Sequence, residues 1–349
     1  MPFNFASILR AWHSYPLRLV FFALLWLAVI TASHLYLNTE REERPVIKMG
    51  YMPVITNLAA PILDAVSLEI PSAIRFKAIK FSSFAEMAEA LRNKEIEAAF
   101  IIAPLSIVLH QQGEDVRVVY IGNRHESTMV VRNDLAASSF TALAGRTIAV
   151  PMRYSGHNLA MLKMASDAGI ENKINVVEMN PPDMASALAA GSLDAYFVGE
   201  PFAAQSLKYG TGKLFFYVEN IWPDFICNLL LVNQRYIDAY PERVKALVEG
   251  AARSGMWAQM NIAQTAQIAS KYWGQPAELV EYALTTPKDR IVFNRFLPVE
   301  AELRNLAAMM ATYGLAEEDD VAGLVVDRFA QQVDLTGIED FHSILKSHK

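Results

Sequence analysis

The chain has 349 residues, of which 53% are hydrophobic and 19% are charged, and its formal net charge is −6. This length and this apolar content allow two domains with large cores, and they exclude a polytopic membrane protein. The acidic balance, without any basic run, argues against nucleic acid as a general partner. The single cysteine, Cys227, excludes an intrachain disulfide and cysteine-rich zinc or iron–sulfur sites.

The first predicted element is a membrane helix over residues 17–37, whose only charged residue is Arg18. This segment is long enough to cross a bilayer. Because Arg10 and Arg18 lie at its N-terminal side, we expect a cytoplasmic tail, a single-pass inner-membrane anchor and a periplasmic globular part. A cleaved signal peptide is the alternative, since Thr31 and Ser33 are small residues at the spacing of a cleavage site.

After Pro45 the pattern of apolar residues predicts a β-α-β-α-β series. The expected strands are residues 46–51, 74–81, a short run ending near 102, and 116–122, and the expected helices are 57–68, 83–94 and 104–112. The next apolar run, residues 128–131, is interpreted as the connection that leaves this first lobe.

A second series opens at Gly145. Its expected strands are residues 147–150, 174–179, 193–199 and 215–218, its helices are 155–167 and 180–191, and residues 225–232 are the return crossing. Beyond Pro241 the pattern predicts helices at 242–273, 276–284, 298–313 and 318–332, which we expect to pack on the first lobe.

An internal repeat organises the chain. Residues 88–105 match residues 185–202 without a gap, at an offset of 97, and the two segments share six identities that include Pro104 and Pro201. Because ligands in open α/β sheets bind beyond the carboxyl ends of the strands, residues 102–104 and 199–201 are expected to face each other across a cleft. The repeat therefore predicts two lobes built on one plan.

The predicted division of the chain follows from this repeat. Residues 1–44 form the tail, anchor and linker, 45–129 the first part of lobe 1, 130–226 lobe 2, and 227–349 the return crossing and the C-terminal helices on lobe 1. The two hinge crossings are expected at residues 129–131 and 229–231.

Four segments carry a resemblance to a known family: residues 50–65, 145–151, 155–170 and 180–202. In this order they resemble the solute-binding proteins of nitrate-, sulfonate- and taurine-type ABC importers, and the resemblance spans roughly residues 46–335. It implies an α/β, two-lobed fold of the type II periplasmic-binding-protein kind with a C-terminal helical segment. The predicted transmembrane helix precedes this fold at the N-terminus. It also implies a small molecule clamped between the lobes, an ABC permease and ATPase as partners, no catalysis and no cofactor.

The start of the helix in lobe 2 is the expected centre of the ligand site, because a helix N-terminus presents free N–H groups and a positive dipole end. His157 stands where nitrate- and bicarbonate-type relatives carry a ligand-contacting histidine. The candidate ligand residues are Arg153, Ser155, Gly156, His157, Asn158, Thr56, Asn57, Pro104 and Glu200. We expect a small polar ligand, an anion rather than a cation. If binding uses the charge of His157, we expect the affinity to fall as this histidine loses its proton. The sequence leaves open whether a metal ion also binds at Glu200.

Two departures from the family narrow the function. Residues 225–232 contain no lysine, whereas nitrate-type relatives place one near this crossing, so nitrate itself is in doubt. The enzymatic branch that handles pyrimidine precursors of thiamine has a cysteine-rich motif, which a single cysteine excludes. The alternative to an importer component is a sensor or accessory subunit that docks on a membrane partner, and a thiamine-precursor-type enzyme is the third hypothesis.

Overall fold

The computed structural model describes residues 15–38, 44–70 and 72–345 of the chain. Its two compact units, residues 1–44 and 45–349, are considered separately. In the first unit, helix α2 (Tyr15–Asn38) is long and apolar enough between Arg18 and Leu35 to cross a membrane, a property that signal sequences share. The predicted apolar helix is therefore present, while Arg10 lies outside the described residues.

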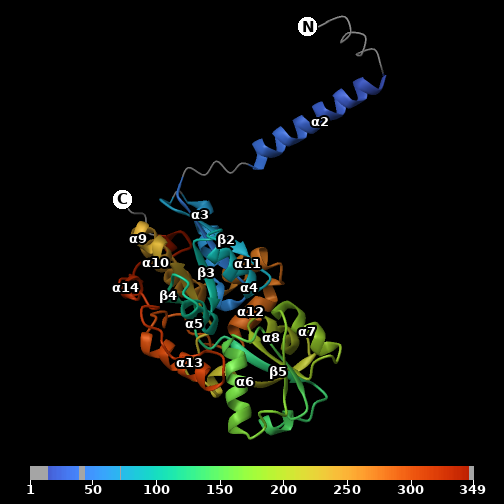
Figure 1. The fold of residues 1–349 in the computed structure, drawn as a ribbon, viewed down its shortest axis with the longest axis vertical. Helices are drawn as coiled ribbons and strands as arrows, with labels where there is room; N and C mark the ends of the chain where they lie inside the picture. The colour runs from blue at the N-terminus through green and yellow to red at the C-terminus, as the bar shows by residue number, and fades with distance from the viewer. Residues whose placement is uncertain (1–14, 39–43, 71, 346–349) are drawn as a thin grey trace, which may run out of the picture. The chain divides into compact units, whose positions relative to one another are not determined.

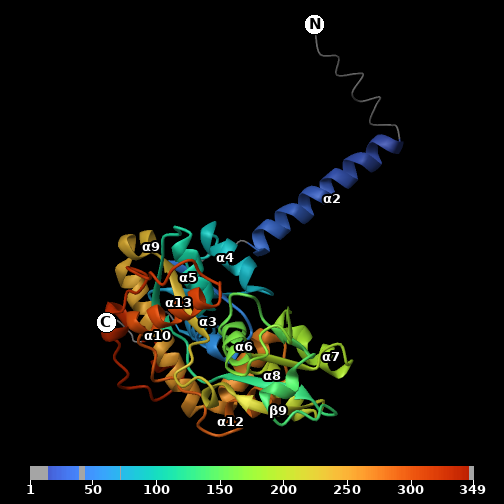
Figure 2. The same cartoon turned by 60° about the horizontal axis from the view of Figure 1, so that its bottom comes forward.

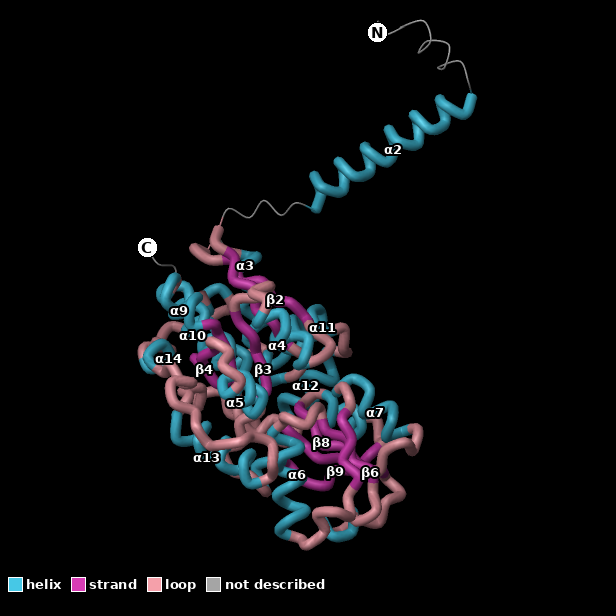
Figure 3. Tube along the Cα trace, viewed as in Figure 1, coloured by secondary structure: helices cyan, strands magenta, loops and turns pink. Residues whose placement is uncertain are grey.

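The first sheet of the larger unit has five strands in the order β2-β1-β3-β10-β4. Figure 3 shows the strands in magenta. These strands are β1 (Val46–Tyr51), β2 (Arg75–Lys80), β3 (Ala98–Ile102), β4 (Val116–Ile121) and β10 (Asn228–Asn233). β1 runs parallel to β2 and β3, whereas β10 runs antiparallel to β3 and β4. Strand β3 is buried along its whole length, which explains its continuous apolar sequence, AAFII.

The second sheet repeats this topology in the order β7-β6-β8-β5-β9. Its strands are β5 (Ser127–Arg132), β6 (Thr147–Val150), β7 (Asn175–Glu178), β8 (Ala195–Gly199) and β9 (Gly212–Tyr217). β6 is parallel to β7 and β8, and β5 is antiparallel to β8 and β9. Each sheet thus contains one antiparallel strand, which the chain enters directly after leaving the other sheet.

The repeat found in the sequence is confirmed element by element. Helix α4 (Phe84–Arg92) and helix α7 (Pro181–Ala189) begin and end at the same offset of 97 residues, and so do β3 and β8. The starts of the two helices differ. Ser83 caps α4 by accepting a hydrogen bond from the Glu86 N–H at 3.2 Å, while α7 opens with two prolines.

Other helices cover the two sheets, as Figures 1 and 2 show. They are α3 (Ala59–Glu69), α5 (Ala103–Gln111), α6 (Gly156–Asp167), α8 (Phe202–Lys208), α9 (Gln234–Ala239), α10 (Pro241–Met260), α11 (Ile262–Trp273), α12 (Ala277–Thr285), α13 (Glu300–Thr312) and α14 (Arg328–Gln331), with short 3₁₀ turns η1 (Ile55–Asn57), η2 (Phe140–Leu143), η3 (Val218–Asn220) and η4 (His342–Ile344). Helices α10 and α11 pack on α3, α13 packs on α5, and α12 contacts α8 beside the second sheet.

Two of the predicted C-terminal helices are wrong in extent. The expected helix 242–273 is interrupted at Asn261, whose φ of −128° and ψ of 54° lie outside the helical region, so α10 and α11 are separate. The expected helix 318–332 is reduced to α14 (Arg328–Gln331), because residues 316–327 run over α5 and β4 as irregular chain. There, Val118 exchanges backbone hydrogen bonds with Leu324 and Val326, which a helix would not permit.

The chain passes between the sheets at residues 122–126 and 218–227. The segments expected to be hinges, 129–131 and 229–231, lie instead inside β5 and β10, where each pairs on both sides. Arg124 forms isolated bridges with Ile226 and Val292, so a third segment joins the two crossings. The lobe boundaries predicted from the sequence stay a prediction.

Candidate ligand-binding site

A cleft of about 270 Å³ has walls from both sheets, at the strand ends where ligands bind in open α/β folds. On one side it is formed by the residue after β1 and the start of α4, and on the other by the residues after β6 and β7 and the start of α7. Its lining residues are Met52, Ser83, Phe84, Ala85, Pro151, Met152, Glu178, Met179, Asn180 and Pro181. This cleft is the candidate ligand-binding site.

The described lining of the cleft carries one carboxylate, Glu178, and neither Lys nor Arg. The helix starts that border it, those of α4 and α7, offer few free N–H groups. The Ser83 hydroxyl already accepts the Glu86 N–H, and the prolines at the start of α7 have no N–H to donate. The walls therefore give an anion little direct electrostatic stabilisation.

Ser155 and Asn158, two predicted ligand residues, fold the loop between β6 and α6. The Ser155 hydroxyl donates to the Met152 carbonyl at 2.7 Å and accepts the Asn158 N–H at 3.1 Å. The Asn158 side chain donates from Nδ2 to the Arg153 carbonyl at 2.8 Å. These bonds hold Met152 where it lines the cleft, and a direct contact of either side chain with a ligand stays a prediction.

His157 is buried inside the second-sheet half, with 1% of its surface exposed. Its Nε2 lies 2.9 Å from the Ser127 hydroxyl, and its ring meets those of Phe197 and Phe225 edge-on. Gly156 also packs against the Phe225 ring. Burial lowers the pKa of His157 to about 3, so the imidazole is neutral near pH 7. This neutral imidazole gives no support to a charged His157 in ligand binding, which stays a prediction.

Arg153 and Pro104 do not line the cleft. Arg153 is exposed and donates from Nη2 to the Gly314 carbonyl at 3.2 Å, beside the end of α13. Pro104 is buried in the first turn of α5, where its missing N–H has no helical partner to lose. We find no contact that would bring either residue to a ligand in the described cleft.

Thr56 and Asn57 lie in the 3₁₀ turn η1, a few residues after the cleft residue Met52. Both are buried, at 2% and 0% exposure. Asn57 donates from Nδ2 to the Met52 carbonyl at 3.0 Å, which supports the cleft wall. The Thr56 hydroxyl has no hydrogen-bond partner among the described residues.

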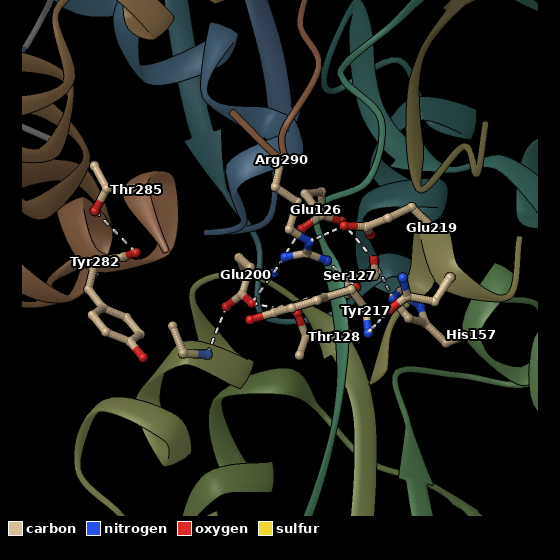
Figure 4. Close-up of polar contacts among 12 residues, drawn as sticks. Glu126, Ser127, Thr128, His157, Glu200, Tyr217, Glu219, Tyr282, Thr285 and Arg290 are labelled. Atoms are coloured by element: carbon tan, nitrogen blue, oxygen red, sulfur yellow. Dashed lines mark hydrogen bonds and ion pairs between the residues drawn. The ribbon is translucent and has the colours of Figure 1, made fainter. Parts of the chain in front are cut away.

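Glu200 is buried and does not line the cleft, and the protein itself satisfies its carboxylate (Figure 4). Oε1 accepts the Thr128 hydroxyl at 2.7 Å, and Oε2 accepts the Ala204 N–H at 2.7 Å. Burial raises the pKa of Glu200, while Arg290, whose Nη1 lies 3.6 Å from Oε1, opposes that rise. Glu200 is therefore part of an internal hydrogen-bond network, and its contact with a ligand stays a prediction.

Arg290 is the centre of that network, although nothing in the sequence singled it out. It extends from the segment between α12 and α13 to the second sheet, where Nε donates to Glu219 at 2.8 Å and Nη2 donates to the Ser127 carbonyl. Its guanidinium also lies 4.3 Å from the centre of the Tyr217 ring. Figure 4 shows Arg290 between Glu200 and Glu219. A single arginine in a long loop has no periodicity or motif that could have revealed this role.

Glu126 is a second residue that the sequence did not single out. It is fully buried in the first crossing, where Oε2 accepts the Glu200 N–H at 2.8 Å and Oε1 accepts the Ser127 hydroxyl at 3.1 Å. Burial raises its pKa to about 7, and the nearby Glu200 carboxylate contributes to the rise. The only sequence sign was an acidic residue directly before an apolar strand.

The described residues, 15–38, 44–70 and 72–345, contain no group of three or more His, Cys, Asp or Glu side chains that could hold a metal ion. Glu126 and Glu200 are neighbours, but the Glu200 N–H, hydroxyl groups and Arg290 occupy their oxygens. The described chain therefore gives no support to a metal site at Glu200.

Comparison with known proteins places the chain in a family. The family model described as NMT1-like matches residues 40–272. The taurine-binding periplasmic protein of Escherichia coli is 24% identical over 271 residues, covering 72% of this chain and 82% of that protein. The nitrate import ATP-binding protein NrtC of Synechocystis sp. is 21% identical over 192 residues, and the match covers 49% of this chain but only 28% of NrtC.

A solved structure shows the same fold. The zinc-bound ligand-binding component of an ABC-type import system from Staphylococcus aureus superposes with a TM-score of 0.74 at 18% identity. The match covers 84% of this chain and all of the other. The two-lobed α/β architecture of the periplasmic-binding-protein kind, predicted from the sequence, is thereby confirmed.

Proposed function

The chain belongs to the NMT1-like family, and on this premise we propose that it is a solute-binding protein, tethered to the inner membrane, that clamps a small polar molecule for an ABC importer. One observation carries the proposal: the cleft whose walls come from the strand ends of both sheets. Two proteins that resemble this chain are named for binding, one as a taurine-binding periplasmic protein and the other as the ligand-binding component of an ABC-type import system, which agrees with a binding role.

The side chains in and near the cleft bear on the charge of the ligand. An anion was expected from the sequence, but His157 is neutral, Arg153 is turned toward Gly314, and Glu178 lines the cleft. An anion in this cleft would have to be held by uncharged donors, and a purely cationic ligand would have Glu178 alone as a charged partner. We therefore propose a polar ligand and retain its anionic character as a prediction.

Tethering rests on helix α2, which is apolar over the length of a bilayer. An uncleaved helix would keep the binding unit beside a membrane partner, either an importer or, as the second candidate, a signalling or accessory subunit. N-terminal sequencing of the protein purified from membranes tests the tether. A mature chain that starts at His34 would show that the helix is a signal peptide.

The binding function is tested by thermal-shift screening of the full chain purified in detergent. The panel consists of nitrate, bicarbonate, taurine, alkanesulfonates and pyrimidines, and a ligand at 100 times its Kd stabilises by about 2.7 kcal/mol. We expect one chemical class to raise the unfolding midpoint in a saturable way. A flat response to the whole panel, in a protein that unfolds cooperatively, would contradict the proposed ligand class.

A further inference from the structure

Several buried side-chain atoms have no hydrogen-bond partner among the described residues, and some of them belong to three uncharged side chains on adjoining segments. These side chains are Thr56, Asn123 and Asn228, with exposures of 2%, 1% and 0%. Within the described residues, no group pairs with the Thr56 hydroxyl, with either side-chain atom of Asn123, or with Oδ1 of Asn228. A buried polar atom that is left unpaired is costly, so a partner from outside the chain is the natural complement.

The three side chains come from segments that meet at one place. Gly122, the residue before Asn123, lies so close to η1 that a Cβ there would be 2.2 Å from the Thr56 carbonyl oxygen and 2.7 Å from its hydroxyl. The Gly122 N–H also donates to the Asn228 carbonyl at 3.1 Å. Only glycine permits this approach, which places the first crossing, η1 and the start of β10 side by side.

Asn57 fixes which end of the Asn228 amide is free. Because the Met52 carbonyl is an acceptor, Asn57 must donate to it from Nδ2, and Asn57 therefore presents Oδ1 to its other neighbour. Asn228 donates to that oxygen from Nδ2 at 2.8 Å, which leaves its own Oδ1 as the unpaired atom. Met52 lines the cleft, so this chain of bonds leads from the cleft wall to Asn228.

We propose that Thr56, Asn123 and Asn228 form an inner polar site that receives a hydrogen-bond donor of the ligand, so the natural ligand carries an amine, hydroxyl or amide group. This inference rests on the proposed function and narrows its ligand class. The free oxygens of Asn123 and Asn228 accept hydrogen bonds only, and a ligand made solely of acceptors, such as nitrate or an unsubstituted alkanesulfonate, leaves them unpaired.

The first test compares two isosteric substitutions in the full chain, purified in detergent and dialysed free of small molecules. Asn123→Leu removes only unpaired atoms, so we expect an unchanged or higher unfolding midpoint. Asn57→Leu is the matched control, because it leaves the Met52 carbonyl and the Asn228 amide unpaired, and we expect a fall of about 4 °C or more. If Asn123→Leu lowers the midpoint as much as the control, Asn123 serves the fold and the inner site is refuted.

The second test uses ligands that differ only in the donor. Taurine, isethionate and ethanesulfonate form one series, and β-alanine, 3-hydroxypropionate and propionate form another. In a series that binds, we expect a donor-bearing member to bind roughly tenfold tighter than the methyl member, and Asn123→Leu to abolish this difference. Equal affinities within a binding series would overturn the inference. If none of the six compounds binds, the anionic form of the proposed function fails, and the stability comparison decides the inner site by itself.

Discussion

The two copies of the internal repeat share one backbone and differ at the end of the strand. The Ala103 N–H donates to the Cys227 carbonyl at 2.9 Å, and the equivalent Glu200 N–H donates to the Glu126 carbonyl at 3.0 Å. Ala103 and Cys227 in the first copy are thus replaced by two carboxylates in the second. The same fold supports an uncharged strand end in one half and a charged one in the other.

The uses of these two ends differ accordingly. In the second copy the charged side chains interact with neighbouring groups of the protein. Arg290 lies between Glu200 and Glu219, and Glu126 accepts hydrogen bonds from its neighbours. In the first copy the polar atoms near the strand end are neutral, and several have no partner among the residues described. We infer that the charged end holds the crossings together, while the uncharged end is left for the ligand.

Removing the central cation of the charged end should have the largest effect. Arg290→Met leaves the buried Glu200 and the partly exposed Glu219 without their shared cation, and breaking a buried pair such as Arg290–Glu200 costs about 3–5 kcal/mol of the free energy of unfolding. Chemical unfolding followed by tryptophan fluorescence measures it. Arg153→Met, at an exposed arginine, is the control and should change stability by less than about 0.5 kcal/mol. Equal small effects would show that the network contributes nothing.

The carboxylate of Glu126 should make the charged end sensitive to pH. The pKa of Glu126 is about 7 in the folded chain, against an ordinary value of 4.5 for an exposed glutamate. Between pH 4.5 and 7 the folded chain therefore keeps a proton that the unfolded chain loses. The free energy of unfolding therefore falls as pH rises from about 4.5 to 7, by about 3 kcal/mol in total. Glu126→Gln should gain stability relative to the wild type over this window. A difference that stays constant with pH would contradict the assignment.

The space for Glu126 depends on the glycine that ends β8. A Cβ at Gly199 would lie 2.6 Å from Oε2 of Glu126, whereas the equivalent residue of the first copy is Ile102. Gly199→Ala should therefore cost about 1–3 kcal/mol through overpacking. Restored stability in the double variant that also carries Glu126→Ala would locate the cause in this contact, and additive losses would place it elsewhere.

The smallest effect is expected at His157. Because its pKa is about 3, its protonation state does not change between pH 6 and 8, so it should add no pH dependence to ligand affinity in that range. Calorimetric titration of the wild type and His157→Gln with the ligand from the screen tests this. We expect parallel pH profiles for the two proteins. If the affinity weakens as pH rises past about 6.5 in the wild type but not in His157→Gln, a charged His157 contributes to binding.

Most of the fold was predictable because it depends on local pattern. The repeat at an offset of 97 located α4, β3, α7 and β8, since apolar period and flanking prolines specify such elements. The hinges were misplaced because the centres of β5 and β10, residues 129–131 and 229–231, are apolar and look like crossings, and only pairing across each sheet shows otherwise.

The site was less predictable because its chemistry depends on long-range contacts. A histidine at a helix start predicts a ligand contact equally well whether it faces solvent or, like His157, is enclosed by Phe197 and Phe225. Arg290 meets Ser127 across more than 160 positions in the chain, and no local pattern encodes that meeting. Asn123 became notable only when its burial and its lack of a partner were known.

The most direct test of the central claim is to block the cleft and measure binding by isothermal titration calorimetry. Ala85 is exposed at the start of α4 and lines the cleft, whereas Ala189 is exposed at the end of α7, away from the lining. We predict that the wild type and Ala189→Trp bind the compound found by screening at one site, and that Ala85→Trp binds none while keeping its unfolding midpoint. Unchanged binding by Ala85→Trp would show that this cleft is not the ligand site.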